Sequence, residues 1–584
     1  MGQLRVHTFD WSGGWVRKSP WSVAYSRLPF ADSRNLCLKL QWHTSLPPPC
    51  KELHLYGKGR GNERISCASG SASFLPALIS PPEEPVLKAP PDPALANRDL
   101  LPIGLSERNF SVWDFWSLWV GLVVGVPTYY LAGSLVELGL SWWQGIATVV
   151  IGNILLLFPL FLSGHAGVKY GIPFPVIARA SFGVRGAHIP AVLRALVACG
   201  WFGIQTWLGG QGIHVLFNTL LEGRLSSCSI TFLGTTLSEW VCFFSFWLFQ
   251  IAILWDGVDG IRKFEKYCAP LLIVMSVALL TWAYITAGGF GSALLAPSWS
   301  IGSAMERRRF WKVFFPALAA NIGFWSTISL NISDFTRHAK HQVDPILGHT
   351  GLPIFMGLFT FLGLAVTSSS EIIFGRVISN PIELLGQIGG VLPVIASVLG
   401  LTLATLTTNV AANVMASANA LANLSPRIFS FRVGAIVTAV IGVIFGPWQF
   451  MKSSESFIST WLVGYSALLG PLSGITLVDY YIIQKTNLDL DALYTTNPNG
   501  KYWYTQGYNL SAIAALFLAV IPCIPGFLHT IGLLKEVPIV LLAMYDNAWM
   551  FGFIAAGLMY WAMVVVPQFW NRRPATSEDG QNSN

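Results

Sequence analysis

The stretch DFWSLWVGLVVGVPTYYLAG, residues 114–133, decides how the chain folds. It is long and apolar enough to cross a bilayer, which takes about 20 mostly apolar residues in a helix. Gly121, Gly125 and Pro127 nevertheless stand in its middle, where they favour a break in the helix. Backbone groups freed at membrane depth are tolerated only where they are buried in protein or line a cavity. The stretch therefore predicts a broken membrane span.

The composition of the whole chain also indicates a membrane protein. Of its 584 residues, 53% are hydrophobic and 11% are charged, whereas soluble domains carry about 25% charged residues. The expected fold class is an all-α polytopic membrane protein with about twelve transmembrane helices. The predicted spans are 112–136, 142–164, 189–220, 231–256, 267–288, 311–333, 349–370, 388–418, 430–446, 458–484, 508–530 and 543–567.

The net charge of +7 does not indicate a nucleic-acid partner, because the basic residues are dispersed over the loops. Most of the basic loops fall on one side of the membrane together with both termini, as the positive-inside rule requires. The run at 307–309 falls on the other side. The eight cysteines have neither disulfide nor metal-site spacing. We expect no cofactor besides a coupling ion, and no obligate protein partner.

The first 96 residues differ from the rest. They contain no spanning segment, and residues 1–80 hold ten basic against four acidic side chains. Such a leader is compatible with an organellar transit peptide, and composition fits a disordered cytosolic tail equally well. We interpret 1–96 as a leader, 97–567 as a membrane domain and 568–584 as a polar C-terminal tail.

The third predicted span contains GWFGIQTWLGG at 200–210. Trp201 and Gln205 are one helical turn apart and share a face. An indole offers a flat apolar surface, and a carboxamide offers both donors and an acceptor. Together they suit a small planar ring with amide-like edges. The alternative is a glutamine bonded to a neighbouring helix beside a tryptophan that only packs.

The eighth predicted span, LATLTTNVAANVMASANAL at 403–421, is unusually polar. Hydroxyls such as those of Thr407 and Thr408 can supply oxygens to a hard monovalent cation, or can bond back to the carbonyl of the preceding turn. Asn409 and Asn413 again share a face. Polar groups inside spans gather at bundle interiors and transport pathways.

The sixth predicted span, FFPALAANIGFWSTISLNISDF at 314–335, has Asn321, Gly323 and Trp325 at mid-membrane. It follows the first broken span by five, just as the polar eighth span follows the third. Interrupted spans at corresponding positions of two halves point to the binding site of an inverted-repeat transporter. We therefore predict two five-helix repeats and two extra helices. Their approximate positions are 112–288, 311–484 and 508–567.

Seven motifs, as an ordered set, resemble the nucleobase–cation symporter-1 family, whose members have a five-plus-five, LeuT-like inverted repeat. The resemblance runs from about Asn97 to about Val566 and, within the family, is to the plant plastidic nucleobase transporters. The motifs are NRDLLPIGLSERNF at 97–110, PFPVIARASFGVRGAHIP at 173–190, WFGIQTWLG at 201–209, FWSTISLNISDFTR at 324–337, TTNVAANV at 407–414, PWQF at 447–450 and GPLSGITLVDYY at 470–481.

This resemblance implies a secondary active transporter for nucleobases such as uracil, adenine or guanine. It implies alternating access, in which spans 1, 2, 6 and 7 rock against spans 3, 4, 8 and 9. In similar transporters two tryptophans stack on the two faces of the ligand, which here gives Trp201 and Trp325. Gln205 and Asn413 would bond the ligand, and Asn409 would support the site.

The resemblance also implies a sodium site between spans 1 and 8. Its ligands would be main-chain oxygens of Gly121, Val124 and Ala404 together with the hydroxyls of Thr407 and Thr408. Neutral oxygens of this kind suit sodium better than a proton, since a proton needs a titratable group.

Proton coupling stays open, because Asp114, Glu137 and Asp334 lie toward span ends. The leader and the plastidic likeness together predict the plastid envelope, with the plasma membrane as the alternative.

Two departures from the family, at Gly125 and Phe324, fall at positions that the resemblance places at the substrate cavity, so we expect both residues to touch the substrate. The bacterial hydantoin-transporting member has a glutamine where this chain has Gly125, and a glycine where it has Phe324. A transporter of allantoin, hydantoin or a pyridine-type vitamin is therefore an alternative. A membrane enzyme with a threonine nucleophile is disfavoured, because no activating His or carboxylate is placed near Thr407 or Thr408. A channel or receptor would not need both a stacking site and a cation site.

Overall fold

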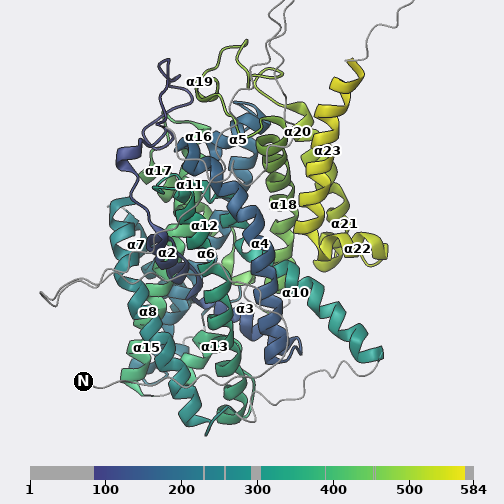
Figure 1. The fold of residues 1–584 in the computed structure, drawn as a ribbon. Helices are drawn as coiled ribbons and strands as arrows, with labels where there is room; N and C mark the ends of the chain where they lie inside the picture. Colours follow the sequence, from purple (N-terminus) through teal and green to yellow (C-terminus); the bar gives the residue numbers. More distant parts are fainter. Residues whose placement is uncertain are drawn as a thin grey trace, which may run out of the picture. The chain divides into compact units, whose positions relative to one another are not determined.

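The computed structural model describes residues 84–227, 230–254, 258–290, 304–388, 390–450, 453 and 456–571. In this part of the chain the regular structure is helical (Figure 1), except for two isolated bridges and a two-residue hairpin of β1 (Thr231–Phe232) and β2 (Thr235–Thr236). The helices are η1 (Leu105–Glu107), α2 (Val112–Val123), α3 (Val126–Glu137), α4 (Trp142–Tyr170), α5 (Phe174–Phe182), α6 (His188–Leu220), η2 (Arg224–Ser227), α7 (Leu237–Leu254), α8 (Val258–Thr286), α10 (Ala304–Asn331), α11 (Ser333–Thr336), α12 (Val343–His349), α13 (Gly351–Phe374), α14 (Pro381–Ile388), α15 (Val391–Thr408), η3 (Asn409–Val414), α16 (Met415–Leu424), α17 (Phe431–Ile444), η4 (Pro447–Gln449), η5 (Ser456–Leu462), α18 (Val463–Val478), η6 (Asp479–Ile483), α19 (Leu490–Leu493), α20 (Leu510–Val520), η7 (Ile521–Cys523), α21 (Ile524–Thr530), α22 (Ile539–Asp546) and α23 (Ala548–Asn571).

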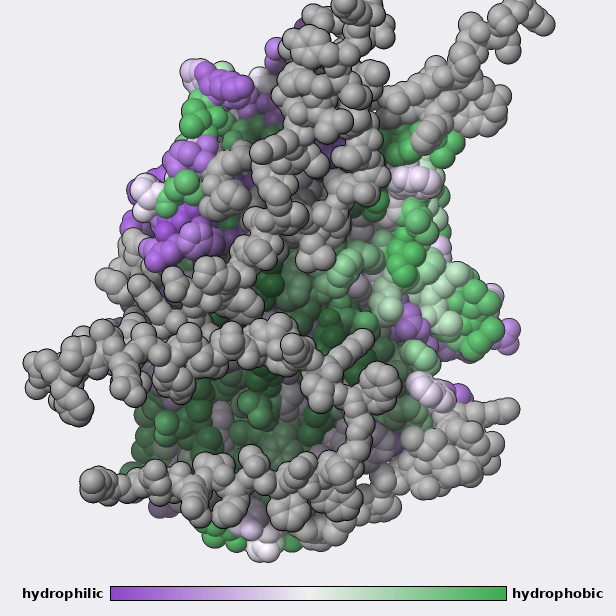
Figure 2. Space-filling view, viewed as in Figure 1, coloured by the Kyte–Doolittle hydropathy of each residue, from purple (hydrophilic) through white to green (hydrophobic). Residues whose placement is uncertain are grey.

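The helices of the described residues match the predicted spans. Ten segments are long and apolar enough to cross a membrane, and the bent pair α2–α3 makes an eleventh. The short apolar helix α17 stands at the position of the ninth predicted span. The all-α polytopic fold class is therefore confirmed. Figure 2 shows the corresponding surface on one face, where hydrophobic side chains cover the span region and hydrophilic ones gather at one end.

The break in the first span is confirmed. α2 ends at Val123, α3 begins at Val126, and the two helices are bent by 59°. Pro127 lies in the first turn of α3, where its missing N–H costs no intrahelical hydrogen bond. Gly125 has an extended conformation at the break.

The expected interruption of the sixth span is wrong. α10 continues as one helix from Ala304 to Asn331, past Gly323. A Cβ at Gly323 would lie 2.2 Å from the Ser466 Oγ and 3.0 Å from the Leu462 carbonyl oxygen. The glycine therefore serves close packing of α10 against α18, and does not break the helix.

The eighth span has an irregularity that the sequence pattern did not predict. Between α15 and α16 the backbone forms the π-helical turn η3, which contains both Asn409 and Asn413. Such turns widen a helix locally and occur frequently at functional sites. Counting apolar residues establishes that a span exists but does not locate such a turn within it.

The predicted start of the fourth span is too early. Its first residues form the β1–β2 hairpin, and α7 begins only at Leu237. The Thr236 amide donates to Glu239 Oε2 at 2.9 Å, and the Glu239 amide donates to Thr236 Oγ1 at 3.3 Å. This reciprocal pair is a capping box, which marks a helix start.

The end of the predicted leader packs against the membrane domain. Leu95 is buried, and its carbonyl accepts a hydrogen bond from Arg179 Nη2 at 2.7 Å. The Asp92 amide donates to the Tyr494 carbonyl at 2.9 Å. The last residues of the predicted leader thus contact the membrane domain, and the boundary at residue 96 stays a prediction. The rest of the leader, residues 1–83, and residues 572–584 of the tail lie outside the described residues.

Candidate functional site

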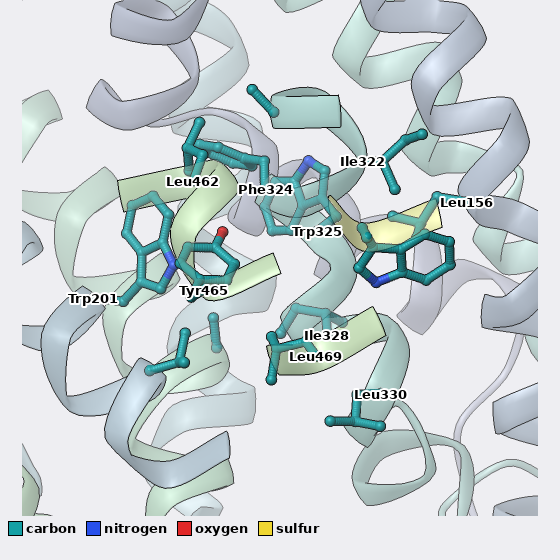
Figure 3. Close-up of a cluster of buried hydrophobic side chains, with 14 of the residues drawn as sticks. Leu156, Trp201, Ile322, Phe324, Trp325, Ile328, Leu330, Leu462, Tyr465 and Leu469 are labelled. Atoms are coloured by element: carbon teal, nitrogen blue, oxygen red, sulfur yellow. The ribbon is translucent and has the colours of Figure 1, made fainter. Parts of the chain in front are cut away.

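An aromatic cluster surrounds Trp201 of α6 (Figure 3). Its indole meets the rings of Phe324, Trp461 and Tyr465 at centroid distances of 5.3, 5.8 and 6.4 Å. Phe457 lies 6.1 Å away. All four contacts are edge-to-face, which is a favourable geometry for aromatic pairs. Trp201 is 5% exposed, so its indole is buried within the cluster.

Phe324 of α10 lies between the two tryptophans that were predicted to sandwich a ligand. Its ring is 5.3 Å from that of Trp201 and 4.9 Å from that of Trp325 (Figure 3). Trp325 itself packs edge-to-face against Trp119 of α2 at 5.5 Å. The structure thus brings the predicted stacking residues into one cluster, with the phenyl ring of Phe324 in the space between them.

Gln205 lies one turn after Trp201 and is 2% exposed. Its side-chain oxygen, Oε1, is buried and has no hydrogen-bond partner among the described residues. A buried polar atom left unpaired costs about 1–3 kcal/mol. The oxygen is therefore ready to accept a hydrogen bond from a ligand N–H.

The two asparagines of η3 belong to a chain of buried amides that ends on α6, which packs against η3. Asn413 Nδ2 donates to Asn409 Oδ1 at 2.8 Å, and Asn409 Nδ2 donates to Gln250 Oε1 at 2.6 Å. Gln250 Nε2 then donates to Thr206 Oγ1 at 2.8 Å. Asn409, which is predicted to support the site, thus bonds both Asn413 and Gln250. Sequence reasoning missed Gln250, although a lone glutamine in the apolar fourth span was a usable signal.

Four of the five predicted cation ligands meet where α2 faces the end of α15. The Thr407 and Thr408 hydroxyls lie 3.2 and 3.0 Å from the Gly121 carbonyl oxygen. Each is also 2.9 Å from the Ala404 carbonyl oxygen. Each hydroxyl therefore has an acceptor on the facing helix α2 and one on the preceding turn of its own helix α15. The fifth predicted ligand, Val124, stands at the break between α2 and α3.

An apolar cavity of about 360 Å³ adjoins this oxygen cluster. It is lined by Val124, Gly125 and Ala404 from the cluster side, and by Met275 and Leu279 of α8, among others. A Cβ at Gly125 would lie 3.5 Å from Thr408 Oγ1, so this glycine brings the break close to the hydroxyl.

Several known proteins are similar to this chain in sequence and in fold. Residues 102–552 match a family described as permeases for cytosine/purines, uracil, thiamine and allantoin. A purine-uracil permease of Arabidopsis thaliana is 57% identical over 473 residues, which cover 81% of this chain and 78% of the relative. An allantoin permease of Bacillus subtilis is 36% identical over 471 residues, or 80% of this chain and 92% of the relative.

The fold resembles that of Mhp1, a nucleobase-cation-symport-1 family transporter solved in a closed conformation with bromovinylhydantoin bound. The TM-score is 0.63 at 24% identity, with 82% of this chain and 96% of Mhp1 covered. An inward-facing structure of Mhp1 gives the same TM-score at 25% identity, with 83% and 96% covered. This chain therefore belongs to the nucleobase–cation symporter-1 family and is an integral, multi-pass membrane permease.

Proposed function

We propose that this permease moves purine bases and uracil across a membrane in symport with a cation, by alternating access. The relative that is 57% identical is named a purine-uracil permease. The observation that carries the proposal is the unpaired Oε1 of Gln205 one turn from the indole of Trp201. A nucleobase offers a ring face for the indole and an N–H for that oxygen.

The energetics favour such a ligand. Stacking of a base on an aromatic side chain contributes about 1–3 kcal/mol, and pairing a buried orphan atom recovers about 1–3 kcal/mol. Asn413, fixed through Asn409, would supply a second polar contact. Stacking between Trp201 and Trp325 requires that Phe324 turn aside when the base enters, because its ring lies between theirs.

Allantoin is the second candidate substrate. Relatives in Bacillus subtilis and Saccharomyces cerevisiae are named allantoin permeases, at 36% and 26% identity. Allantoin also presents amide edges that would suit Gln205 and Asn413. It lacks the fully planar aromatic ring of a nucleobase, so it would gain less from stacking on Trp201.

We assign the coupling cation to the oxygens of Gly121, Val124, Ala404, Thr407 and Thr408. The neutral oxygens favour sodium over a proton. Since α2 belongs to span 1 and α15 to span 8, an ion held there would fix the spacing between the two groups of spans that move in alternating access.

The decisive experiment is uptake by purified protein in liposomes, measured with radiolabelled uracil, adenine, guanine, allantoin and a hydantoin. Each substrate is tested with an inward sodium gradient, with a pH gradient and with neither. Accumulation of a nucleobase against its gradient supports the proposal. Accumulation of allantoin alone would show that allantoin, and not a nucleobase, is the substrate. Equilibration of the substrate without accumulation would show that transport is not coupled to a cation.

We propose that the protein resides in the plastid envelope, because its leader is basic and its motifs resemble those of plastidic transporters. The plasma membrane is the alternative. A fluorescent fusion carrying residues 1–96 distinguishes the two. Import into plastids supports the proposal. Retention in the cytosol would show that the leader does not target, and the full-length fusion would then report the membrane.

A further inference from the structure

Arg194 of α6 is a buried cation that none of the predicted site roles uses. It is 1% exposed. It precedes Trp201 by seven residues, which is two helical turns, so both side chains leave α6 on the same face. A charged side chain within a span is costly and usually marks a functional position.

The guanidinium of Arg194 joins three helices. Its Nε lies 3.0 Å from the Thr327 carbonyl oxygen and 2.9 Å from Asn331 Oδ1, both on α10. Its Nη2 donates to the carbonyl of Ala412 in η3 at 3.1 Å. Arg194 therefore connects α6 to the π-helical turn that carries Asn413, and to the part of α10 that follows Trp325.

The charge of Arg194 is compensated through a relay. Asn331 Nδ2 donates to Asp334 Oδ2 at 2.9 Å, and Asp334 Oδ1 accepts from the Phe174 amide of α5 at 2.9 Å. The direct partners of Arg194 are neutral, so the buried charge is not held by a simple ion pair. This buried network therefore differs from an exposed salt bridge, which contributes little to stability. Its hydrogen bonds fix the positions of the helices that carry the acceptors.

We propose that Arg194 is a positioning residue for substrate binding: it holds η3, and with it Asn413, in register with Trp325 on α10. The inference rests on the proposed function, in which Asn413 and Trp325 contact the base. During alternating access α10 moves relative to α6 and η3, so the bonds to Thr327 and Asn331 would break in each cycle. The bond to Ala412 would persist, because α6 and η3 belong to the same group of spans.

Arg179 of α5 provides a matched control. It is buried as completely as Arg194, and it bonds Asn423 Oδ1 and the carbonyls of Leu95 and Leu493. Burial lowers the pKa of Arg179 to about 10, which leaves it charged at neutral pH. Its partners belong to the ends of α16 and α19 and to the segment before α2, and none of them is a predicted site residue.

The test compares Arg194→Gln, Arg194→Lys and Arg179→Gln in the purified full-length chain, with equilibrium binding of radiolabelled uracil and adenine as the readout. Arg194→Gln should weaken binding about tenfold, the equivalent of one lost hydrogen bond to the ligand. Arg194→Lys should restore part of the affinity, since an ammonium can still donate to one or two of the three acceptors. Arg179→Gln should leave the dissociation constant within about twofold of the parent, whatever its effect on thermal stability.

Unchanged affinity in Arg194→Gln overturns the proposal, and so does an equal loss in Arg179→Gln. If the parent binds no base, the proposed function fails. The contact of Arg194 with α10 is then tested by protein stability, without ligand. Arg194→Gln, Asn331→Ala and the double variant are then compared by melting temperature. A double variant whose loss of stability is smaller than the sum of the two single losses supports the contact between Arg194 of α6 and Asn331 of α10, whereas additive losses overturn it.

Discussion

Replacing Gln205 by leucine should weaken substrate binding without destabilising the protein. The leucine keeps most of the side-chain volume and removes the amide. A bound base would then bury an N–H without a partner, at a cost of about 1–3 kcal/mol, which corresponds to an affinity loss of about 5- to 160-fold. The free protein loses no hydrogen bond to Oε1, because that oxygen has no partner among the described residues. Its melting temperature should therefore stay equal to that of the parent or rise.

The same substitution at Gln250 is the matched control. Both amide ends of Gln250 are bonded, to Asn409 and to Thr206, so Gln250→Leu should lower the melting temperature. Binding of radiolabelled base and thermal unfolding in detergent are measured on both variants. A destabilised Gln205→Leu with parental affinity would mean that Gln205 joins helices and does not touch substrate, which would refute the reasoning.

Three further outcomes are expected. Trp201→Ala should raise the Michaelis constant for uptake about 5- to 160-fold, and Trp201→Phe less, because a ring face for stacking remains; equal effects would indicate packing. Thr408→Ala should abolish the stimulation of uptake by sodium at fixed pH, with choline as the replacement ion. Uptake by the parent that ignores sodium but collapses with a protonophore would instead direct attention to Asp334. A variant lacking residues 1–83 should transport like the parent in liposomes, and loss of transport would assign those residues a role beyond targeting.

Much of the architecture follows from the sequence because hydrocarbon imposes simple demands. About 20 apolar residues per span and the need to satisfy every backbone group determine where helices lie. Gly121, Gly125 and Pro127 therefore predicted the break between α2 and α3. The oxygens of Thr407, Thr408, Ala404 and Gly121 lie together in the structure, while their role as cation ligands stays a prediction.

The errors concern residues whose role depends on a neighbouring helix. The sequence pattern predicts a break at Gly323, whereas its missing side chain admits Ser466 of α18. The turn η3 depends on local backbone geometry that apolar spacing does not report. Phe324 is not one of these errors, because the resemblance places it at the substrate cavity. Its contacts with both Trp201 and Trp325 are nevertheless visible only in the structure, since an apolar side chain has the same signature whether it faces lipid, a helix or a binding site.

The inverted repeat relates the oxygen cluster to Arg194. Span 1 corresponds to span 6, and span 8 to span 3, so a contact between spans 1 and 8 has its counterpart between spans 6 and 3. In the first contact, Thr407 and Thr408 meet the Gly121 carbonyl, and an added cation would strengthen the junction. In the second, the carbonyl of Thr327 meets a cation that is part of the chain, the guanidinium of Arg194. With the cation bound as proposed, one junction would depend on ion concentration while the other is permanently charged. This asymmetry would let a dissociable ion bias which side of the membrane the site faces.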